Sequence, residues 1–227
     1  PKVRQAVMAA VETMRLYPDP MASAVIEALA QTLGVRPGQV TLGNGSDEIL
    51  AFCFQALCPN GVAFPDISYG FYPVYAQLYQ VDIHTIPLRD DFTLAVEDYA
   101  GLGRTIVFAN PNAPTGLALS RAQIATMLET NPGSLVIVDE AYIDFGAESA
   151  IPLLEQYDNL MVVGTFSKSR AMAGARLGYA VASEALIADL NLIKYSFNPY
   201  NLNRMTLAAG AAVLEDASYF EACAQKI

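Results

Sequence analysis

The sequence predicts an α/β fold, a three-layer αβα sandwich around a mostly parallel sheet. Two observations lead to this prediction. Apolar, β-branched runs of strand length recur along the chain, and the segments between them have apolar residues at the three- and four-residue spacing of helices. A chain that alternates strands and helices in this way typically forms a parallel sheet with helices on both faces.

Seven strands are expected, each a short run of mostly apolar residues bounded by turn residues. They span residues 39–42, 61–64, 82–87, 105–109, 134–138, 160–165 and 177–182. Four helices with clear apolar periodicity are expected at residues 47–57, 70–79, 121–129 and 184–195. Ser46 and Ser120 are predicted to be N-caps, because a serine hydroxyl can accept a hydrogen bond from an amide of the first helical turn.

Size and composition exclude several classes of protein. The chain has 227 residues, 53% of them apolar and 16% charged, which allows a substantial core and argues against a disordered chain. Its apolar stretches are interrupted too often for a membrane span. The net charge of −10 argues against nucleic acid or an anionic membrane as a partner, because both favour cationic surfaces. Any anion that the protein binds must therefore be held by a local group of donors.

Cysteine and histidine are too sparse for a metal centre or a histidine-based catalytic triad. Cys53, Cys58 and Cys223 lack the spacing of metal ligands, and we expect them to be reduced core residues of a cytoplasmic protein. His84 is the single histidine and falls in an alternating run, so we expect it on the solvent face of a strand. No metal site is predicted.

Polar residues that follow the predicted strands are the main candidates for a site, because ligands of parallel sheets bind beyond the carboxyl ends of the strands. The first strand leads into a glycine-rich turn at residues 43–48 and then a helix. Amides and the helix dipole of such a turn can hold a phosphate, although a simple tight turn is an alternative. A dinucleotide fingerprint would need a third glycine, and position 48 is glutamate. The fourth strand leads into a rigid polar loop at residues 110–116.

Two other strands are followed by charged residues. Asp139 follows the strand of residues 134–138, and its burial would require a cationic partner or good hydrogen bonds. A helix-capping role is the alternative for this carboxylate. Arg176 immediately precedes the last strand and can reach the same edge of the sheet as a phosphate ligand.

Lys168 follows the strand of residues 160–165 and stands beside hydroxyl groups. An amine that is partly desolvated at a strand end can have a lowered pKa and become a nucleophile. The other three lysines are expected on helix surfaces: Lys2, Lys194 and Lys226. An amine, a carboxylate, a phosphate-binding turn and an arginine are together what pyridoxal phosphate requires for its aldehyde, ring nitrogen and phosphate.

The sequence resembles the fold-type I pyridoxal-phosphate-dependent aminotransferases of class I and II, and most closely their histidinol-phosphate aminotransferase branch. The similarity runs in the family's order over nearly the whole chain, through residues 16–20, 43–48, 68–70, 110–116, 139–142, 167–168 and 174–178. The resemblance implies the large domain of that fold at residues 21–227, after an N-terminal helix and dimer-contacting segment at residues 1–20. The family's C-terminal small domain, with an arginine for the substrate carboxylate, is expected to be absent from this chain.

The resemblance also implies the catalytic residues. Lys168 would form a Schiff base with pyridoxal 5'-phosphate, Asp139 would pair with the ring nitrogen, and Tyr69 would stack on the ring. Tyr142 would hydrogen-bond the phenolic oxygen of the ring. Asn112 would contact the same oxygen, in place of an asparagine that the family commonly has one position later.

Further residues are implied for the cofactor phosphate and the substrate. The phosphate would be held by Gly45, Ser46, Asp47, Thr165, Ser167 and Arg176. Tyr17 would reach into the site of the partner subunit and contact cofactor and substrate there. Tyr200 and Asn201 would line the substrate side of the pocket.

The implied activity is transamination of L-histidinol phosphate with 2-oxoglutarate, which gives imidazole-acetol phosphate and glutamate in histidine biosynthesis. The family's enzymes are homodimers with shared active sites, so a homodimer is expected. The alternatives are a threonine-phosphate decarboxylase-like enzyme, an aromatic amino-acid aminotransferase and a noncatalytic pyridoxal-phosphate-binding fragment. A nicotinamide-binding domain built on the glycine-rich turn would explain neither Asp139 nor Arg176.

Overall fold

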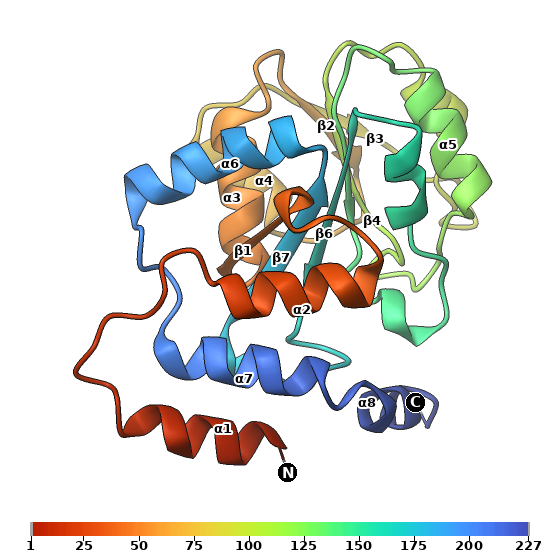
Figure 1. Cartoon of the computed structure of the whole chain (residues 1–227). Coiled ribbons are helices and arrows are strands. Elements are labelled where there is room, and N and C mark those ends of the chain that lie inside the picture. The colour runs from red at the N-terminus through yellow and green to blue at the C-terminus, as the bar shows by residue number, and fades with distance from the viewer. Residues whose placement is uncertain (1, 227) are drawn as a thin grey trace. The chain divides into compact units, whose positions relative to one another are not determined.

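The computed structural model describes residues 2–226 and divides into two compact units. The first unit consists of Pro1–Ile49 and Gly164–Ile227, and the second of Leu50–Val163. Helix α3 (Ser46–Ala56) begins in the first unit and ends in the second, and strand β6 (Leu160–Thr165) runs from the second into the first. Elements are labelled in Figure 1.

In the first unit, two antiparallel strands lie between helices. Strand β1 (Val40–Asn44) pairs with β7 (Leu177–Ala182), with Val40 opposite Val181. Helix α2 (Ser23–Leu33) packs against β1 and against α7 (Arg204–Leu214), and α6 (Glu184–Phe197) packs against both strands. Helix α1 (Lys2–Val11) lies along α7 in Figure 1, and α8 (Ala217–Ala224) follows α7.

The alternation of side chains along β1 explains this arrangement. Val40 and Leu42 are buried in one apolar cluster with α2 and α7, whereas Thr41 points to the opposite face and hydrogen-bonds a residue of α6. The helices therefore cover both faces of β1.

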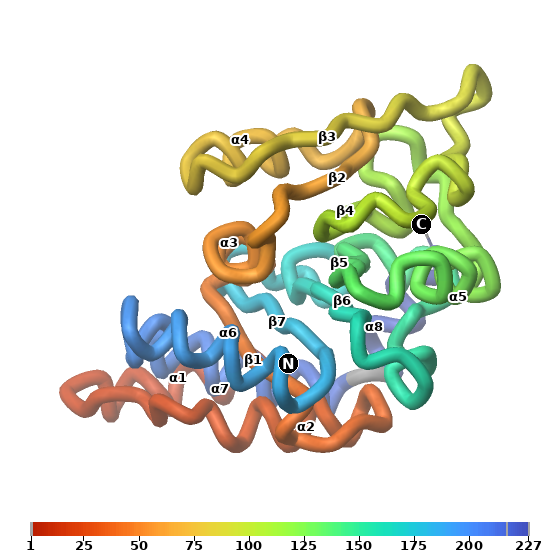
Figure 2. Tube along the Cα trace, turned by 90° about the horizontal axis from the view of Figure 1, so that it is seen from above, coloured from red at the N-terminus to blue at the C-terminus, as the bar shows by residue number. Residues whose placement is uncertain are grey.

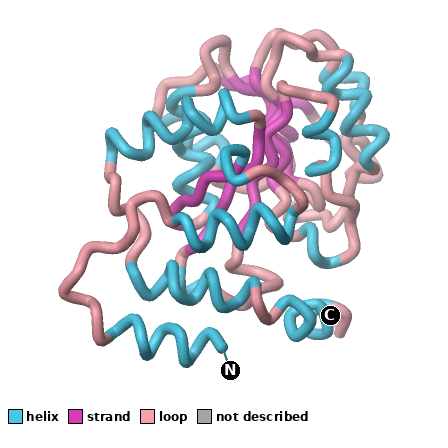
Figure 3. The backbone as a smooth tube through the Cα atoms, viewed as in Figure 1, coloured by secondary structure: helices cyan, strands magenta, loops and turns pink. Residues whose placement is uncertain are grey.

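In the second unit, five strands lie side by side in the order β6-β5-β4-β2-β3, and every neighbouring pair is parallel. Figure 2 shows them one after another, and Figure 3 shows the strands in magenta among helices. Their bounds are Val62–Pro65 for β2, Ile83–Ile86 for β3, Thr105–Ala109 for β4 and Val136–Asp139 for β5. Helices α4 (Tyr72–Leu78) and α5 (Arg121–Glu129) belong to this unit. The β-branched residues of β4 and β5 are buried, as in a parallel sheet covered on both faces.

The predicted fold class is confirmed: the strands are mostly parallel and alternate with helices. Strands β4, β6 and β7 and helix α5 have the predicted bounds, and the other predicted elements are shifted by one or two residues. Helices α2 and α7 were not predicted. The division at residue 20 stays a prediction.

The two predicted N-caps have different outcomes. The Ser120 side chain accepts a hydrogen bond from Gln123 N, and the Gln123 side chain bonds back to Ser120 N, so the cap of α5 is confirmed. The prediction for Ser46 is wrong, because α3 begins at Ser46 itself and Gly45 occupies the position before it. Ser46 therefore belongs to the first turn of the helix.

The cysteines and the histidine mostly follow expectation. Cys53 and Cys58 are buried free thiols, and burial raises the pKa of Cys58 to about 12. Cys223 is only partly buried in α8, so its prediction as a core residue is wrong. His84 is exposed on β3, as predicted. Among residues 2–226, no group of three or more histidine, cysteine or acidic side chains could hold a metal ion, and no helix could cross a membrane.

The prediction that Lys194 lies on a helix surface is wrong. Lys194 is 6% exposed and shares the buried face of α6 with Ile187 and Leu190. Its Nζ donates to Thr41 Oγ1 at 2.9 Å, and the Thr41 hydroxyl donates to Asn191 Oδ1 at 2.6 Å. Burial lowers the pKa of Lys194 to about 8, although the negative charge of Glu48 opposes this shift.

Substitution of Lys194 tests its burial through the pH dependence of stability. Between about pH 8 and 10.5 the unfolded chain binds a proton that the folded chain has released, so the free energy of unfolding rises with pH. We expect a rise of roughly 2 kcal/mol from this group between pH 7.5 and 10, which Lys194→Met should remove. Urea unfolding at the two pH values measures it.

The control is Lys2→Met, because the Lys2 side chain is 49% exposed. This variant should keep the rise of the wild type. An equal rise in Lys194→Met and wild type would contradict the burial of the amine.

Candidate active site

The glycine-rich turn between β1 and α3 is in close contact with Arg176. Gly45 has a φ of +79°, which favours glycine, and its N donates to Arg176 O at 3.0 Å. A Cβ on Gly45 would overlap the Arg176 guanidinium. Arg176 Nη2 also donates to Asp47 Oδ2 at 2.9 Å. The structure thus brings three of the predicted phosphate ligands together within the first unit.

Gly178 allows β7 to approach this turn. A Cβ at Gly178 would lie far inside contact distance of Ser46 N and of the carbonyl carbon of Gly45. Both are backbone atoms and could not move without displacing the turn. The contact between β7 and the first turn of α3 therefore depends on the lack of a side chain at position 178.

The hydroxyls of Thr165 and Ser167 lie beside the same strand. Thr165 Oγ1 donates to Ser167 Oγ at 3.0 Å and accepts from Ser167 N at 3.1 Å. The turn is attached to β7 by the bond from Phe166 N to Leu177 O, at 2.9 Å. Leu177 is the residue between Arg176 and Gly178, and both of these residues contact the glycine-rich turn. The two hydroxyls are therefore held near that turn.

These residues form a group that can bind an anion; we call Gly45, Ser46, Asp47, Thr165, Ser167 and Arg176 the anion group. The Arg176 side chain is 45% exposed, so its charge is accessible to a ligand. First-turn amides of a helix have no partner within the helix, and the helix dipole favours negative charge at this end. The group has the donors that a phosphate requires, and its role in binding one stays a prediction.

Lys168 lies in the turn that follows Ser167, and its side chain is exposed. Ala171 N donates to Lys168 O at 2.9 Å and closes the turn. The predicted partial desolvation of the Lys168 amine stays a prediction. An exposed amine beside the anion group can still form a covalent bond with a ligand.

Asp139, at the end of β5 in the second unit, is 4% exposed. Its Oδ2 accepts from the Tyr72 hydroxyl at 3.0 Å and its Oδ1 from Ala141 N at 3.1 Å. These bonds stabilise a carboxylate whose burial would otherwise be costly. Burial and the charge of Asp139 raise the pKa of Tyr72 well above its usual value, so Tyr72 stays a donor. Tyr72 was not among the predicted site residues.

Tyr69 lies close to this pair. Its ring meets the Tyr72 ring edge-on at 5.6 Å and stacks with Phe71 at 5.8 Å. Tyr72 therefore contacts both Tyr69 and Asp139, two of the three predicted catalytic residues. The ring of Tyr69 is fixed by aromatic neighbours in an orientation that the sequence alone does not indicate.

The loop after β5 is anchored by Glu140, which is 2% exposed. Its carboxylate accepts from Ala150 N at 2.6 Å and from the Ser149 hydroxyl at 2.7 Å. Burial raises the pKa of Glu140 to about 7, although these two bonds oppose the shift. The anchor closes the loop that includes Tyr142, whose ring lies 6.3 Å from that of Phe145. Glu140, like Tyr72, was not among the predicted site residues.

Asn112 lies in the loop after β4, where its Nδ2 donates to Ile67 O at 2.9 Å. Its Oδ1 is buried and has no hydrogen-bond partner among the described residues. Buried polar atoms without a partner are rare in proteins, and a ligand or an ordered water can supply the missing hydrogen bond. The side chain therefore fits a ligand-binding role, while its contact with the cofactor ring stays a prediction.

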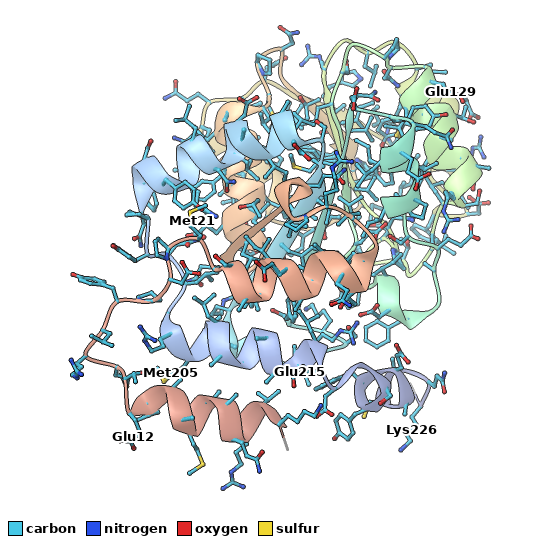
Figure 4. All side chains as sticks on the ribbon, in the orientation of Figure 1. Glu12, Met21, Glu129, Met205, Glu215 and Lys226 are labelled. Atoms are coloured by element: carbon cyan, nitrogen blue, oxygen red, sulfur yellow. The ribbon has the colours of Figure 1, made fainter. Side chains whose placement is uncertain are left out.

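Tyr17 and Tyr200 stack on each other in the first unit, with centroids 4.6 Å apart. The Arg204 guanidinium donates to Tyr17 O, and Tyr17 itself is 77% exposed. The pair lines a pocket of about 500 Å³, together with Met205, which Figure 4 shows between α7 and α1. The structure brings these two predicted residues together. The role of Tyr17 in a partner subunit stays a prediction.

Asn201 makes a contact that was not predicted. Its Nδ2 donates to Glu48 Oε2 at 2.6 Å, and its carbonyl accepts from Asn44 Nδ2 at 3.1 Å. Asn201 is thus attached to the glycine-rich turn. Its role with the substrate stays a prediction.

Comparisons with known proteins agree with these observations. Residues 1–227 match the family described as Aminotransferase class I and II. Histidinol-phosphate aminotransferase 1 of Bordetella parapertussis is 48% identical over 233 residues, which cover 100% of this chain and 65% of that protein. Histidinol-phosphate aminotransferase of Chromohalobacter salexigens is 52% identical over 219 residues, or 96% of this chain and 62% of that protein. The chain spans less than two thirds of the length of these curated relatives.

A solved structure shows the same fold. Histidinol-phosphate aminotransferase from Sinorhizobium meliloti, in complex with pyridoxal-5'-phosphate, superposes with a TM-score of 0.88 at 25% identity. The match covers 100% of this chain and 63% of that one.

Gly178→Ala tests the close approach of β7 to the glycine-rich turn. The added methyl group would force backbone atoms of Gly45 and Ser46 to move, so we expect a loss of about 1–3 kcal/mol of stability. Urea unfolding measures it. Gly174→Ala is the matched control, because no atom lies within 4 Å of its Cβ position, and it should change stability by less than about 0.5 kcal/mol. Equal effects of the two substitutions would contradict the contact.

Tyr72→Phe tests the hydrogen bond to Asp139. The substitution keeps the ring but leaves a buried carboxylate oxygen without this donor, so stability should fall by about 1–3 kcal/mol. Thermal or urea unfolding measures the loss. Tyr79→Phe, at the C-terminal end of the same helix, should have little effect because Tyr79 is partly exposed. A neutral Tyr72→Phe would show that the carboxylate does not depend on Tyr72.

Proposed function

The chain belongs to the class I and II aminotransferase family, and on this premise we propose that it is the pyridoxal-phosphate-binding part of an aminotransferase for L-histidinol phosphate. Relatives that are 48% and 52% identical have this activity in their names. The observation that most supports the proposal is local to the first unit. The exposed Lys168 comes directly after Ser167 of the anion group, and Arg176 supplies the positive charge of that group.

The anion group would hold the phosphate of the cofactor. Arg176 would supply a guanidinium, and Thr165 and Ser167 would supply hydroxyls. Amides of the first turn of α3 would add donors at the positive end of the helix dipole. A phosphate that is anchored at several points fixes the position of the rest of the cofactor. The reacting bond can then be held in the orientation that the reaction requires.

Lys168 would bond covalently to the aldehyde of the cofactor. Pyridoxal phosphate, when bound, supplies an electron sink for the bond that breaks next to the substrate's amino group. As a free amine, Lys168 Nζ would be the general base that takes and holds the proton from the substrate's α-carbon.

Four further predicted residues would act on the ring. Asp139, whose carboxylate accepts bonds from Tyr72 and Ala141, would keep a proton on the ring nitrogen. Tyr69 would stack on the ring face, and Tyr142 and Asn112 would contact its phenolic oxygen. The Oδ1 of Asn112, which has no hydrogen-bond partner among residues 2–226, is consistent with a ligand at this residue.

The proposal includes the second substrate and the assembly. The acceptor would be 2-oxoglutarate, and the protein would be a cytoplasmic homodimer. The exposed Tyr17, stacked on Tyr200, would reach the site of the other subunit.

A single-turnover assay tests the proposed activity. The chain is loaded with pyridoxal phosphate, mixed with L-histidinol phosphate, and analysed for the keto product. We expect that Lys168→Ala lowers the rate at least about a hundredfold, since it removes the general base. Lys226→Ala is the control, because Lys226 is exposed at the end of the chain (Figure 4) and should leave the rate unchanged.

Two results would contradict the proposal. Full turnover by Lys168→Ala would exclude Lys168 as the catalytic lysine. An amine product with loss of carbon dioxide, from a phosphorylated amino acid, would indicate a decarboxylase.

A further inference from the structure

Glu48 is buried in part at the start of α3, and the proposed function assigns it no role. It stands where a dinucleotide-binding turn would have glycine. Resting on the proposed function, we propose that Glu48 is a positioning residue: its carboxylate holds the segment of Tyr200 and Asn201 against the glycine-rich turn of the anion group.

The geometry consists of three hydrogen bonds that close a ring. Glu48 Oε2 accepts from Asn44 N at 2.7 Å and from Asn201 Nδ2 at 2.6 Å. Asn44 Nδ2 donates to Asn201 O at 3.1 Å. The two bonds to the carboxylate are short, as expected when the acceptor is charged. Three residues from two distant parts of the chain are thereby fixed to one another.

The ring has a site residue on each side. Asn44 precedes Gly45, whose N bonds to Arg176 O in the anion group. Asn201 follows Tyr200, which stacks on Tyr17. The position of the aromatic pair is therefore coupled to the position of the anion group within the first unit.

The segment between α6 and α7 has local hydrogen bonds besides this ring: Asn198 N donates to Lys194 O at 2.8 Å, and Tyr200 N donates to Asn198 Oδ1 at 3.0 Å. Residues 198–200 are exposed and have neither helix nor strand structure. Leu202 is buried and Asn203 caps α7, so the C-terminal end of the segment is anchored independently. The bond to Glu48 anchors Asn201, directly beside Tyr200.

Simple helix capping does not explain both bonds. A glutamate in the first turn commonly bonds back to an amide just before the helix, and the bond to Asn44 N is of this kind. The bond to Asn201 adds nothing to the helix end. It links the helix to the segment that the proposed function places on the substrate side.

Hydrogen exchange on the cofactor-free chain tests the hydrogen bond between Glu48 and Asn201 without a measurement of activity. Glu48→Ala should accelerate exchange of the amides of Asn198 and of residues 200–202 at least about fivefold, and leave the interior of α7 unchanged. Glu48→Gln keeps an acceptor oxygen and should give a smaller increase. Glu27→Ala, an exposed residue of α2, is the matched control and should have no effect. Unchanged exchange in Glu48→Ala would overturn the proposal.

Kinetics test the consequence for the substrate. In the loaded chain, Glu48→Ala should raise KM for L-histidinol phosphate about tenfold, the effect expected for a lost hydrogen bond to a charged group, with kcat changed less. Glu48→Gln should restore part of the loss. Faster exchange with an unchanged KM would overturn the role in substrate positioning.

The two proposals fail in different ways. If the wild-type chain forms no covalent adduct with pyridoxal phosphate at Lys168, the proposed function fails, while the exchange experiment still decides whether Glu48 holds the segment. If turnover is normal and both exchange and KM are unaffected by Glu48→Ala, the role of Glu48 fails alone.

Discussion

The first unit is organised around the contact between a strand and a turn that two glycines permit. Gly178 lets β7 lie against the backbone of Gly45 and Ser46, and Gly45 leaves room for the Arg176 guanidinium. Arg176 itself adopts a φ of +54°, an unusual conformation for a non-glycine residue, and this places its carbonyl where Gly45 N can donate to it. The hydrogen bond between Phe166 and Leu177 holds the turn of Lys168 beside β7. It also positions the hydroxyls of Thr165 and Ser167, which bond to each other. A group that can bind a phosphate therefore results from backbone packing more than from side-chain charge.

The main constraint in the second unit is the burial of a carboxylate at the end of a central strand. Asp139 is kept in place by a tyrosine hydroxyl and a backbone amide, both neutral donors. These bonds offset part of the cost of burying a charged group. The neighbouring Glu140 has the same kind of support, from Ser149 and Ala150, and serves to close the loop.

Most of the fold and many of the site residues could be predicted from the sequence, and the failures have physical causes. Strand ends were predictable because parallel strands are short apolar runs followed by polar residues. Helix α7 was missed because its residues are mostly small or apolar on every side, which removes the periodicity. Lys194 was misplaced because a long aliphatic stem can lie on a buried helix face when a hydroxyl, here Thr41, accepts from its amine. Tyr72 and Glu48 act through partners distant in sequence, and no local pattern identifies such partners.

The account rests on one claim, that Lys168 is the residue that binds the cofactor covalently beside the anion group. The most direct measurement is to incubate the chain with pyridoxal phosphate, reduce with borohydride, and locate the modified lysine by peptide mass spectrometry. The account predicts a single adduct on Lys168, lost in Lys168→Ala and weakened when Arg176 is replaced by alanine. An adduct on Lys2, Lys194 or Lys226 instead, or labelling of Lys168 that is unaffected by the Arg176 substitution, would contradict it.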